Sequence, residues 1–269
     1  MKNKKSDKEG KIKKIDFKLN NEQKEKQTSL EQDEDNLEND YDPKLDPEPI
    51  VIFDCELDSI EELKAVDLLY LIDTTASMNC YLKGIKNFVR KMTWDIEKCL
   101  SKFILDEIDV LKVGIVTYKD HDDEDNTYLT NIKIDLTGNL KEVNSIILGL
   151  DCGGGKDEPE AVLDGLNTAV NNISWRNESI KFIFHILDAP PHGKKYNNIE
   201  IDKYENCPKN IDIDQIFVEM RNKNINYSII KLNDSIELMI QEFQKKINLK
   251  ILTPTIYYDK SKIMSQDLN

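Results

Sequence analysis

The segment DTTAS at 73–77 places three oxygen-bearing side chains, Asp73, Thr75 and Ser77, at alternate positions between an apolar run and a helical pattern. Carboxylate and hydroxyl oxygens are hard ligands that suit Mg²⁺ or Mn²⁺. A simpler explanation is that Thr75 or Ser77 caps the N-terminus of the following helix. The residue types of this segment alone leave both explanations open.

Two further loops contribute an acidic residue each. Asp157 lies in the glycine-rich run CGGGKDEPEAV at 152–162, and Asp188 lies in LDAPPHG at 187–193. Three consecutive glycines permit backbone conformations that other residues avoid. The run lacks the GxxxxGK[ST] pattern of a phosphate-binding loop, so we do not expect it to bind a nucleotide. Asp188 by itself would also fit a turn before proline.

The elements that must position these residues alternate along the chain. Apolar runs predict strands at 66–73, 110–120, 127–136, 180–189, 225–232 and 249–258. Helical spacing predicts helices at 81–100, 140–150, 159–173, 211–223 and 236–247. This alternation predicts an α/β fold: a doubly wound, Rossmann-like three-layer sandwich with a mainly parallel sheet and one antiparallel edge strand. The strands at 127–136 and 249–258 are expected at sheet edges, the latter because Pro254 cannot donate to a ladder.

In such folds the ligand lies beyond the carboxyl ends of the strands. The predicted strands at 66–73 and 180–189 both end at this edge of the sheet. Asp73 and Asp188 are therefore expected to lie there together with Asp157. A turn or a helix cap does not account for this convergence, whereas a metal site does. We therefore predict Mg²⁺, or Mn²⁺ or Ca²⁺, as the cofactor.

Composition narrows the class of protein. The chain has 269 residues, a formal net charge of −14 and a pI near 4.8, which disfavours nucleic-acid binding. Its five scattered cysteines contain no CxxC pair and suit a reducing compartment. No apolar run is long enough to span a membrane, and no secretory signal is found at the start, so a cytoplasmic location is expected.

The charge pattern predicts three parts. Residues 1–60 are expected to form a disordered charged arm, because they carry too few apolar side chains to offset the entropy lost on ordering. Residues 61–258 are expected to form the folded domain, and residues 259–269 a C-terminal tail.

Four motifs in order resemble one known family. DLLYLIDTTASM, VTYKDH at 116–121, GGGKDEPEAVLDGLN at 153–167 and HILDAPPHG at 185–193 are similar to the von Willebrand factor type A (VWA) domains found in alpha-type protein kinases. The resemblance covers about Val66 to Asn233. It implies an adhesion-type metal site whose open position accepts a carboxylate from a protein partner, with no bond chemistry.

Residue by residue, the resemblance implies that Thr75 and Ser77 ligate the ion through hydroxyls. Asp73 would contact it directly or through water, and Asp188 would supply the carboxylate of the third loop. The family usually has a threonine in the second loop, and here Asp157 is the nearest oxygen donor.

Two alternatives remain. A phosphohydrolase of the haloacid dehalogenase type would need a second acid where this chain has Thr75, so general acid catalysis lacks a carboxylate. The other is a VWA scaffold whose metal site is empty. Among other polar residues, His185 is expected to be a satisfied core residue, and His192 either supports the site or belongs to a turn. The acidic run at 120–125 either holds a second cation or is a solvated loop.

Overall fold

The computed structural model describes residues 65–101, 110–121, 128–200, 202–254, 256 and 258. The predicted arm at 1–60 and the predicted tail at 259–269 lie outside the described residues. Most of the predicted domain at 61–258 lies within them. Among the described residues, no helix has both the length and the apolar character needed to cross a membrane.

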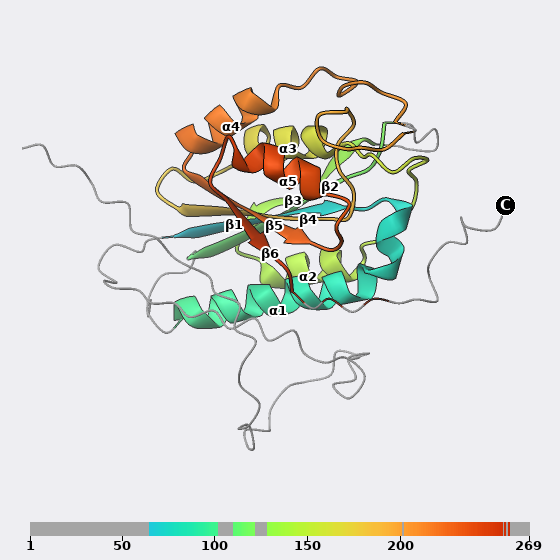
Figure 1. Ribbon diagram of the computed structural model, residues 1–269. Helices are drawn as coiled ribbons and strands as arrows, with labels where there is room; N and C mark the ends of the chain where they lie inside the picture. The colour runs from blue at the N-terminus through green and yellow to red at the C-terminus, as the bar shows by residue number, and fades with distance from the viewer. Residues whose placement is uncertain are drawn as a thin grey trace, which may run out of the picture.

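A single six-stranded sheet forms the centre of the domain, with strand order β3-β2-β1-β4-β5-β6 (Figure 1). The strands are β1 (Val66–Asp73), β2 (Leu111–Tyr118), β3 (Thr130–Thr137), β4 (Ile180–Leu187), β5 (Ile225–Lys231) and β6 (Leu249–Leu252). All neighbouring strands are parallel except β2 and β3, which are antiparallel. This confirms the predicted fold class, with β3 as the antiparallel edge strand and β6 at the opposite edge.

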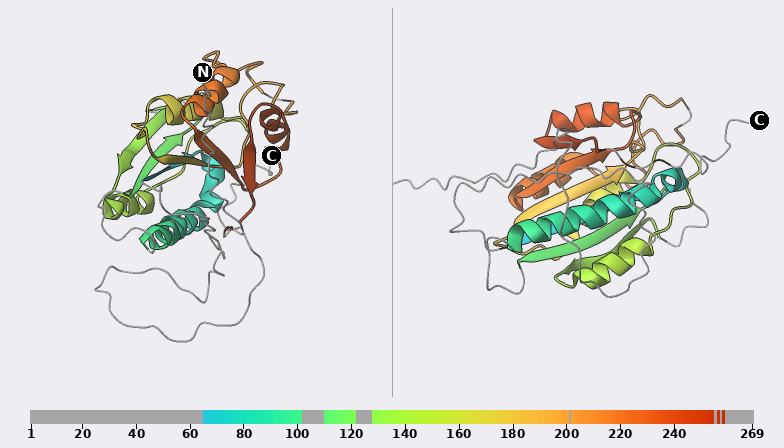
Figure 2. Two further views of the ribbon diagram at one scale, coloured as in Figure 1. Left: turned by 90° about the vertical axis from the view of Figure 1, so that its left-hand side faces the viewer. Right: turned by 90° about the horizontal axis from the view of Figure 1, so that it is seen from below.

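Helices cover both faces of the sheet, as the two further views show (Figure 2). The helices are η1 (Ala76–Cys80, a 3-10 helix), α1 (Leu82–Ser101), α2 (Leu140–Leu148), α3 (Val162–Asn171), α4 (Ile213–Asn222) and α5 (Glu237–Gln244). α1 and α2 lie on one face, and α3, α4 and α5 lie on the other (Figures 1 and 2). Every residue of β1 is buried, which explains why its sequence is a continuous apolar run and not an alternating one.

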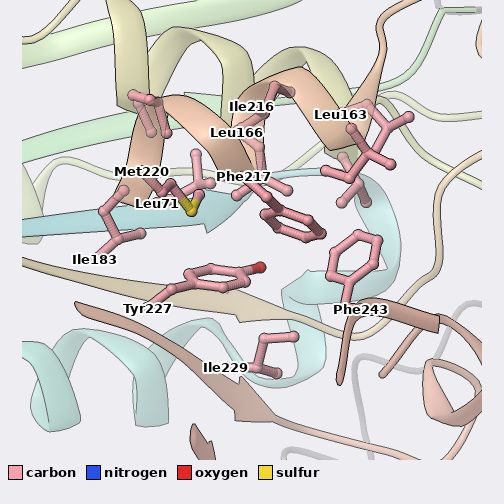
Figure 3. Packing of buried hydrophobic residues seen from close by; sticks show 14 of the residues in the cluster. Leu71, Leu163, Leu166, Ile183, Ile216, Phe217, Met220, Tyr227, Ile229 and Phe243 are labelled. Carbon is pink, nitrogen blue, oxygen red and sulfur yellow. The ribbon is translucent and has the colours of Figure 1, made fainter. Parts of the chain in front are cut away.

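On the face covered by α3, α4 and α5, aromatic and aliphatic side chains of the helices pack onto the sheet (Figure 3). Phe217 of α4 and Phe243 of α5 meet edge to face, with ring centroids 5.2 Å apart. Leu166 of α3 packs in the same cluster above Leu71 of β1. This packing fixes α3, whose first turn faces the carboxyl ends of the strands.

His185 of β4 is a satisfied core residue, as predicted. Its side chain is fully buried, with Nε2 at 2.9 Å from the Tyr118 hydroxyl and Nδ1 at 2.8 Å from the Tyr227 hydroxyl. Burial lowers the pKa of His185 to about 3, so the ring is neutral.

Several boundaries differ from the prediction by a few residues, and two of these differences have a clear cause. α3 begins at Val162 and not at Pro159, because the Glu160 N–H donates to the Pro190 carbonyl at 2.9 Å and draws the chain into a bridge with Pro191. The last strand ends at Leu252, two residues before Pro254, which cannot donate to a ladder.

Candidate metal centre

Asp73 lies at the end of β1, at the start of the loop at 73–77, and its two carboxylate oxygens have different surroundings. Asp73 Oδ1 accepts hydrogen bonds from the Thr75 N–H at 2.9 Å and the Thr75 hydroxyl at 2.7 Å. The side chain is fully buried, yet Oδ2 has no hydrogen-bond partner among the residues that the structure describes. A buried carboxylate oxygen without a partner is costly in an otherwise satisfied interior, and a bound cation would remove that cost.

The hydroxyls of this loop connect it to Asp188 in the loop after β4. Ser77 Oγ donates to Asp188 Oδ1 at 3.0 Å, and Thr75 Oγ1 lies 3.3 Å from Ser77 Oγ. Thr75 precedes η1, but its side chain makes no capping hydrogen bond there. The two hydroxyls therefore face carboxylates. They do not cap the N-terminus of the following helix, which was the simpler explanation of their spacing.

The glycine-rich run packs directly onto the first loop. The Ala76 N–H donates to the Gly154 carbonyl at 2.9 Å, and the Gly153 N–H donates to the Thr74 carbonyl at 3.0 Å. Lys119 Nζ donates to the carbonyls of Thr74 and Gly153 and so joins the two segments from the end of β2.

Gly155 shows why this run needs glycine. Its φ is +81°, and a Cβ there would lie 3.1 Å from Glu160 Oε1 and 3.3 Å from Thr75 Cβ. The close approach brings the Glu160 carboxylate beside Thr75. Glu160 is only 3% exposed, and its Oε2 has no hydrogen-bond partner within the described part of the chain.

The sequence analysis did not identify Glu160 as a site residue. The proline before it predicted a helix start, where an exposed glutamate is ordinary.

Asp157, the predicted donor of the second loop, has both carboxylate oxygens buried and lies beside the same site. It lines an open hollow of about 440 Å³ together with Ser77, Asp188 and Glu160, and we call this space the hollow. One Asp157 oxygen also groups with Asp120 and His192, with all three ligand atoms within 4.8 Å of one another. The hydrogen-bonded chain from Asp73 to Asp188 runs through the two hydroxyls and does not include Asp157.

His192, which was expected either to support the site or to belong to a turn, lies in a bend and contacts two carboxylates. Its Nε2 lies 2.9 Å from Asp120 Oδ1 and its Nδ1 lies 2.9 Å from Asp202 Oδ1. Burial by itself would lower the pKa of His192, but the hydrogen bonds to the two carboxylates raise it. The ring thus ties the end of β2 to the long connection after β4.

Three buried acids face one another at this sheet edge. Burial, and then the charge of Asp188, raises the pKa of Asp73 to about 8. Burial raises the pKa of Asp188 to about 6. Burial, followed by the charges of Asp73 and Asp120, raises the pKa of Glu160 well above its usual value. A divalent cation would offset this negative charge, and the all-oxygen donor set fits a hard ion such as Mg²⁺.

Comparison with known proteins agrees with the predicted resemblance. Residues 62–247 match the family model described as Mediator complex subunit 25 von Willebrand factor type A. The alpha-protein kinase vwkA of Dictyostelium discoideum is 29% identical over 189 residues. That match covers 70% of this chain and 29% of the kinase, so the chain spans less than a third of that relative's length.

Two solved structures are similar at low sequence identity. The SpRpn10 VWA domain is 14% identical with a TM-score of 0.47, over 74% of this chain and 93% of that one. BatB from Bacteroides thetaiotaomicron is 15% identical with a TM-score of 0.40, over 62% of this chain and 66% of that one. Because the family model matches residues 62–247, well over half of the sequence, this chain belongs to the von Willebrand factor type A family.

Proposed function

We propose that this VWA domain is a protein-binding module that depends on a divalent metal ion. Asp73, Thr75, Ser77 and Asp188 would hold Mg²⁺, or Mn²⁺ or Ca²⁺, at the floor of the hollow. Asp157 and Glu160 would add negative charge beside it. The observation that carries the proposal is the buried Asp73 Oδ2, which has no hydrogen-bond partner among the described residues.

The ion would serve as a bridge to the partner. Mg²⁺ keeps open or water-filled positions when proteins supply only part of its shell. The hollow is open, so one such position can accept a carboxylate oxygen from a protein partner. The acidic walls favour this contact only when the ion is present, because without it they would repel an incoming carboxylate.

The residues of the site do not support phosphoryl transfer. A phosphohydrolase that uses Asp73 as a nucleophile needs a second carboxylic acid to protonate the leaving group. Thr75 occupies that position, and its hydroxyl donates to Asp73 Oδ1 at 2.7 Å. We propose a binding module for this reason, and turnover of a phosphate ester that is lost in an Asp73→Asn variant would favour the enzyme instead.

Calorimetric titration of the full chain with Mg²⁺, Mn²⁺ and Ca²⁺ tests the proposal. We expect one saturable site in the wild type that Asp73→Asn and Ser77→Ala abolish. Ser101→Ala is the matched control, because Ser101 is exposed and its hydroxyl, within the described residues, donates to the Lys98 carbonyl of the same helix. Equal binding by Ser77→Ala and Ser101→Ala, or saturable binding by none of the proteins, would refute the proposed site.

A further inference from the structure

A second cluster of potential ligands lies on the α3 side of the hollow, formed by His121, Asp164 and Cys207. Asp164 Oδ2 lies 2.9 Å from His121 Nε2 and 3.8 Å from Cys207 Sγ. All three ligand atoms lie within 4.8 Å of one another. We propose that these three residues bind a transition-metal ion of the zinc class, at a site separate from the oxygen-lined centre of Asp73 and Asp188.

The separations suit a tetrahedral ion. Zinc bonds of about 2.0–2.3 Å to nitrogen, oxygen and sulfur place neighbouring ligand atoms roughly 3.3–3.7 Å apart. The observed contacts of 2.9 Å and 3.8 Å need only small side-chain shifts to reach that range. Three protein ligands leave the fourth position of such an ion to water.

The donor set selects a different metal from the first site. Imidazole and thiolate are borderline and soft ligands, which favour zinc and similar transition metals over Mg²⁺. The first site offers only hydroxyl and carboxylate oxygens. The two sites therefore differ in the ions they would accept, although both lie near the carboxyl ends of the strands.

The side chains of the cluster are largely buried, so an uncompensated charge on them would cost free energy. Asp164 is 4% exposed, although it lies in the first turn of α3 among apolar residues. Cys207 is 9% exposed, and the His121 side chain is 8% exposed. Lys209 Nζ lies 3.3 Å from Asp164 Oδ1 and so orients that oxygen outward, while Oδ2 faces the histidine and the thiol. Such support of a ligating carboxylate is typical of metal sites.

The arrangement does not fit nucleophilic catalysis by cysteine. In a Cys-His-Asp triad the acid and the thiol bond opposite nitrogens of the imidazole ring. Here Cys207 Sγ is within 3.8 Å of the same Asp164 oxygen that lies against His121 Nε2. The three groups converge on one point, as ligands do, and are not arranged in series.

A bound ion would cross-link three parts of the fold. His121 follows β2, Asp164 belongs to α3, and Cys207 belongs to the connection between β4 and α4. The same connection carries His192, whose ring centroid is 5.6 Å from that of His121. The ion would thus hold this connection beside the hollow.

Cobalt serves as the spectroscopic probe, because a cysteine thiolate bound to Co²⁺ gives a strong near-ultraviolet charge-transfer band. The full chain is titrated with Co²⁺ in a reductant that does not chelate metals. We expect a saturable thiolate-to-cobalt band in the wild type, and displacement of the Co²⁺ by one equivalent of Zn²⁺. His121→Gln should weaken binding at least tenfold, and Cys207→Ser should remove the band.

Cys99→Ser is the matched control, because Cys99 belongs to α1 and lies outside the cluster. It should keep the band, as should Asp73→Asn, whose change lies in the oxygen-lined site. Thermal melts of each variant identify any that fail to fold, and His121→Gln supplies the answer if Cys207→Ser is one of them. No band in the wild type, or a band unchanged in both Cys207→Ser and His121→Gln, would overturn the proposal.

Discussion

Ser77 Oγ donates a hydrogen bond to Asp188 Oδ1 across 3.0 Å, although the two residues are 111 positions apart in the chain. The sheet produces this contact. β1 and β4 are parallel neighbours with Ile72 opposite Ile186, so the loops that follow them leave the same edge side by side. The hydroxyl thereby holds the Asp188 carboxylate toward the site that also contains Asp73.

Glu160→Gln tests the acid that the sequence analysis missed. Removing its charge should weaken Mg²⁺ binding at least about tenfold, or 1.4 kcal/mol, because the carboxylate beside Thr75 is buried and little screened. Calorimetric titration gives the affinity. Glu158→Gln removes the same charge at an exposed position that also lines the hollow. If both variants lose affinity equally, Glu160 has no special place in the site.

Gly165→Ala should destabilise the domain even though alanine favours helix. A Cβ at Gly165 would lie 2.6 Å from Tyr118 Cδ1, and Tyr118 is held in place by its hydrogen bond to His185. We expect a net loss of about 1–3 kcal/mol in the free energy of unfolding, measured with urea. At Gly149 the nearest atom would be 3.5 Å away, so Gly149→Ala should cost less than about 1 kcal/mol. Equal stability of the two variants would contradict the tight contact between α3 and β2.

Asp67→Ala should destabilise the fold without affecting the metal site. Asp67 is fully buried at the start of β1 and accepts hydrogen bonds from Arg176 Nε at 2.6 Å and the Ser179 hydroxyl at 2.6 Å. Losing it leaves Arg176 without its carboxylate. We expect a cost of about 3 kcal/mol, at the low end for such pairs because Arg176 is partly exposed. Urea denaturation measures this cost.

Asp95→Ala is the control for that measurement, since Asp95 pairs with Lys91 on the surface of α1 at 3.6 Å. The two side chains are 31% and 17% exposed, and an i,i+4 pair of this kind on a helix contributes less than about 1 kcal/mol. Mg²⁺ affinity should be unchanged in Asp67→Ala, because Asp67 lies at the opposite end of β1 from the site. A large loss of affinity would mean that the site depends on the whole strand and not on its carboxyl end.

His185 makes the fold sensitive to acid. Its pKa is about 3 in the folded protein and about 6.5 in the unfolded chain, so the unfolded state binds more protons between these values. Stability is therefore lost as pH falls below about 6.5, by about 2 kcal/mol at about pH 5. The buried acids Asp73 and Asp188 have raised pKa values and act in the opposite direction. Their contribution must be separated from that of His185.

His185→Gln provides that separation. It keeps a polar side chain between Tyr118 and Tyr227 but cannot take up a proton, so the stability gap between wild type and variant should narrow as pH falls from 7 to 5. Urea denaturation at several pH values measures the gap. A gap that does not change with pH would mean that the pKa of His185 is not lowered in the folded protein.

The sequence predicts which distant residues lie together where the local apolar pattern and the geometry of the sheet agree. The apolar runs that end at Asp73 and just before Asp188 indicated buried strands, and parallel pairing then placed both acids at one edge. Asp157 was chosen by its place in the glycine-rich run, but the loop's path, set by positive φ at Gly154 and Gly155, also brings Glu160 beside Thr75. No local pattern encodes that path.

The cluster of His121, Asp164 and Cys207 could not be predicted for a related reason. Its members come from two loops and a helix far apart in sequence, with no short spacing that signals a metal site. His121 lay in the acidic run at 120–125, for which a solvated loop was a more ordinary interpretation than a second cation site. Only the packing of α3 against the connection before α4 brings Asp164 and Cys207 together.

Thermal melting of wild type and Asp73→Asn, each in EDTA and in Mg²⁺, tests the central claim most directly. Asparagine keeps the shape of the side chain and an oxygen that can accept from Thr75, but removes the charge next to Asp188. In EDTA we expect the variant to melt at the same temperature as the wild type or higher, because the repulsion between the two acids is relieved.

In Mg²⁺ at about a hundredfold excess over Kd, the wild type alone should gain about 2.7 kcal/mol, which corresponds to a rise of roughly 5–10 °C in Tm. Asp73→Asn should show the same Tm in both buffers. If the wild type melts at one temperature in EDTA and across millimolar Mg²⁺, the metal-dependent account of this domain is wrong.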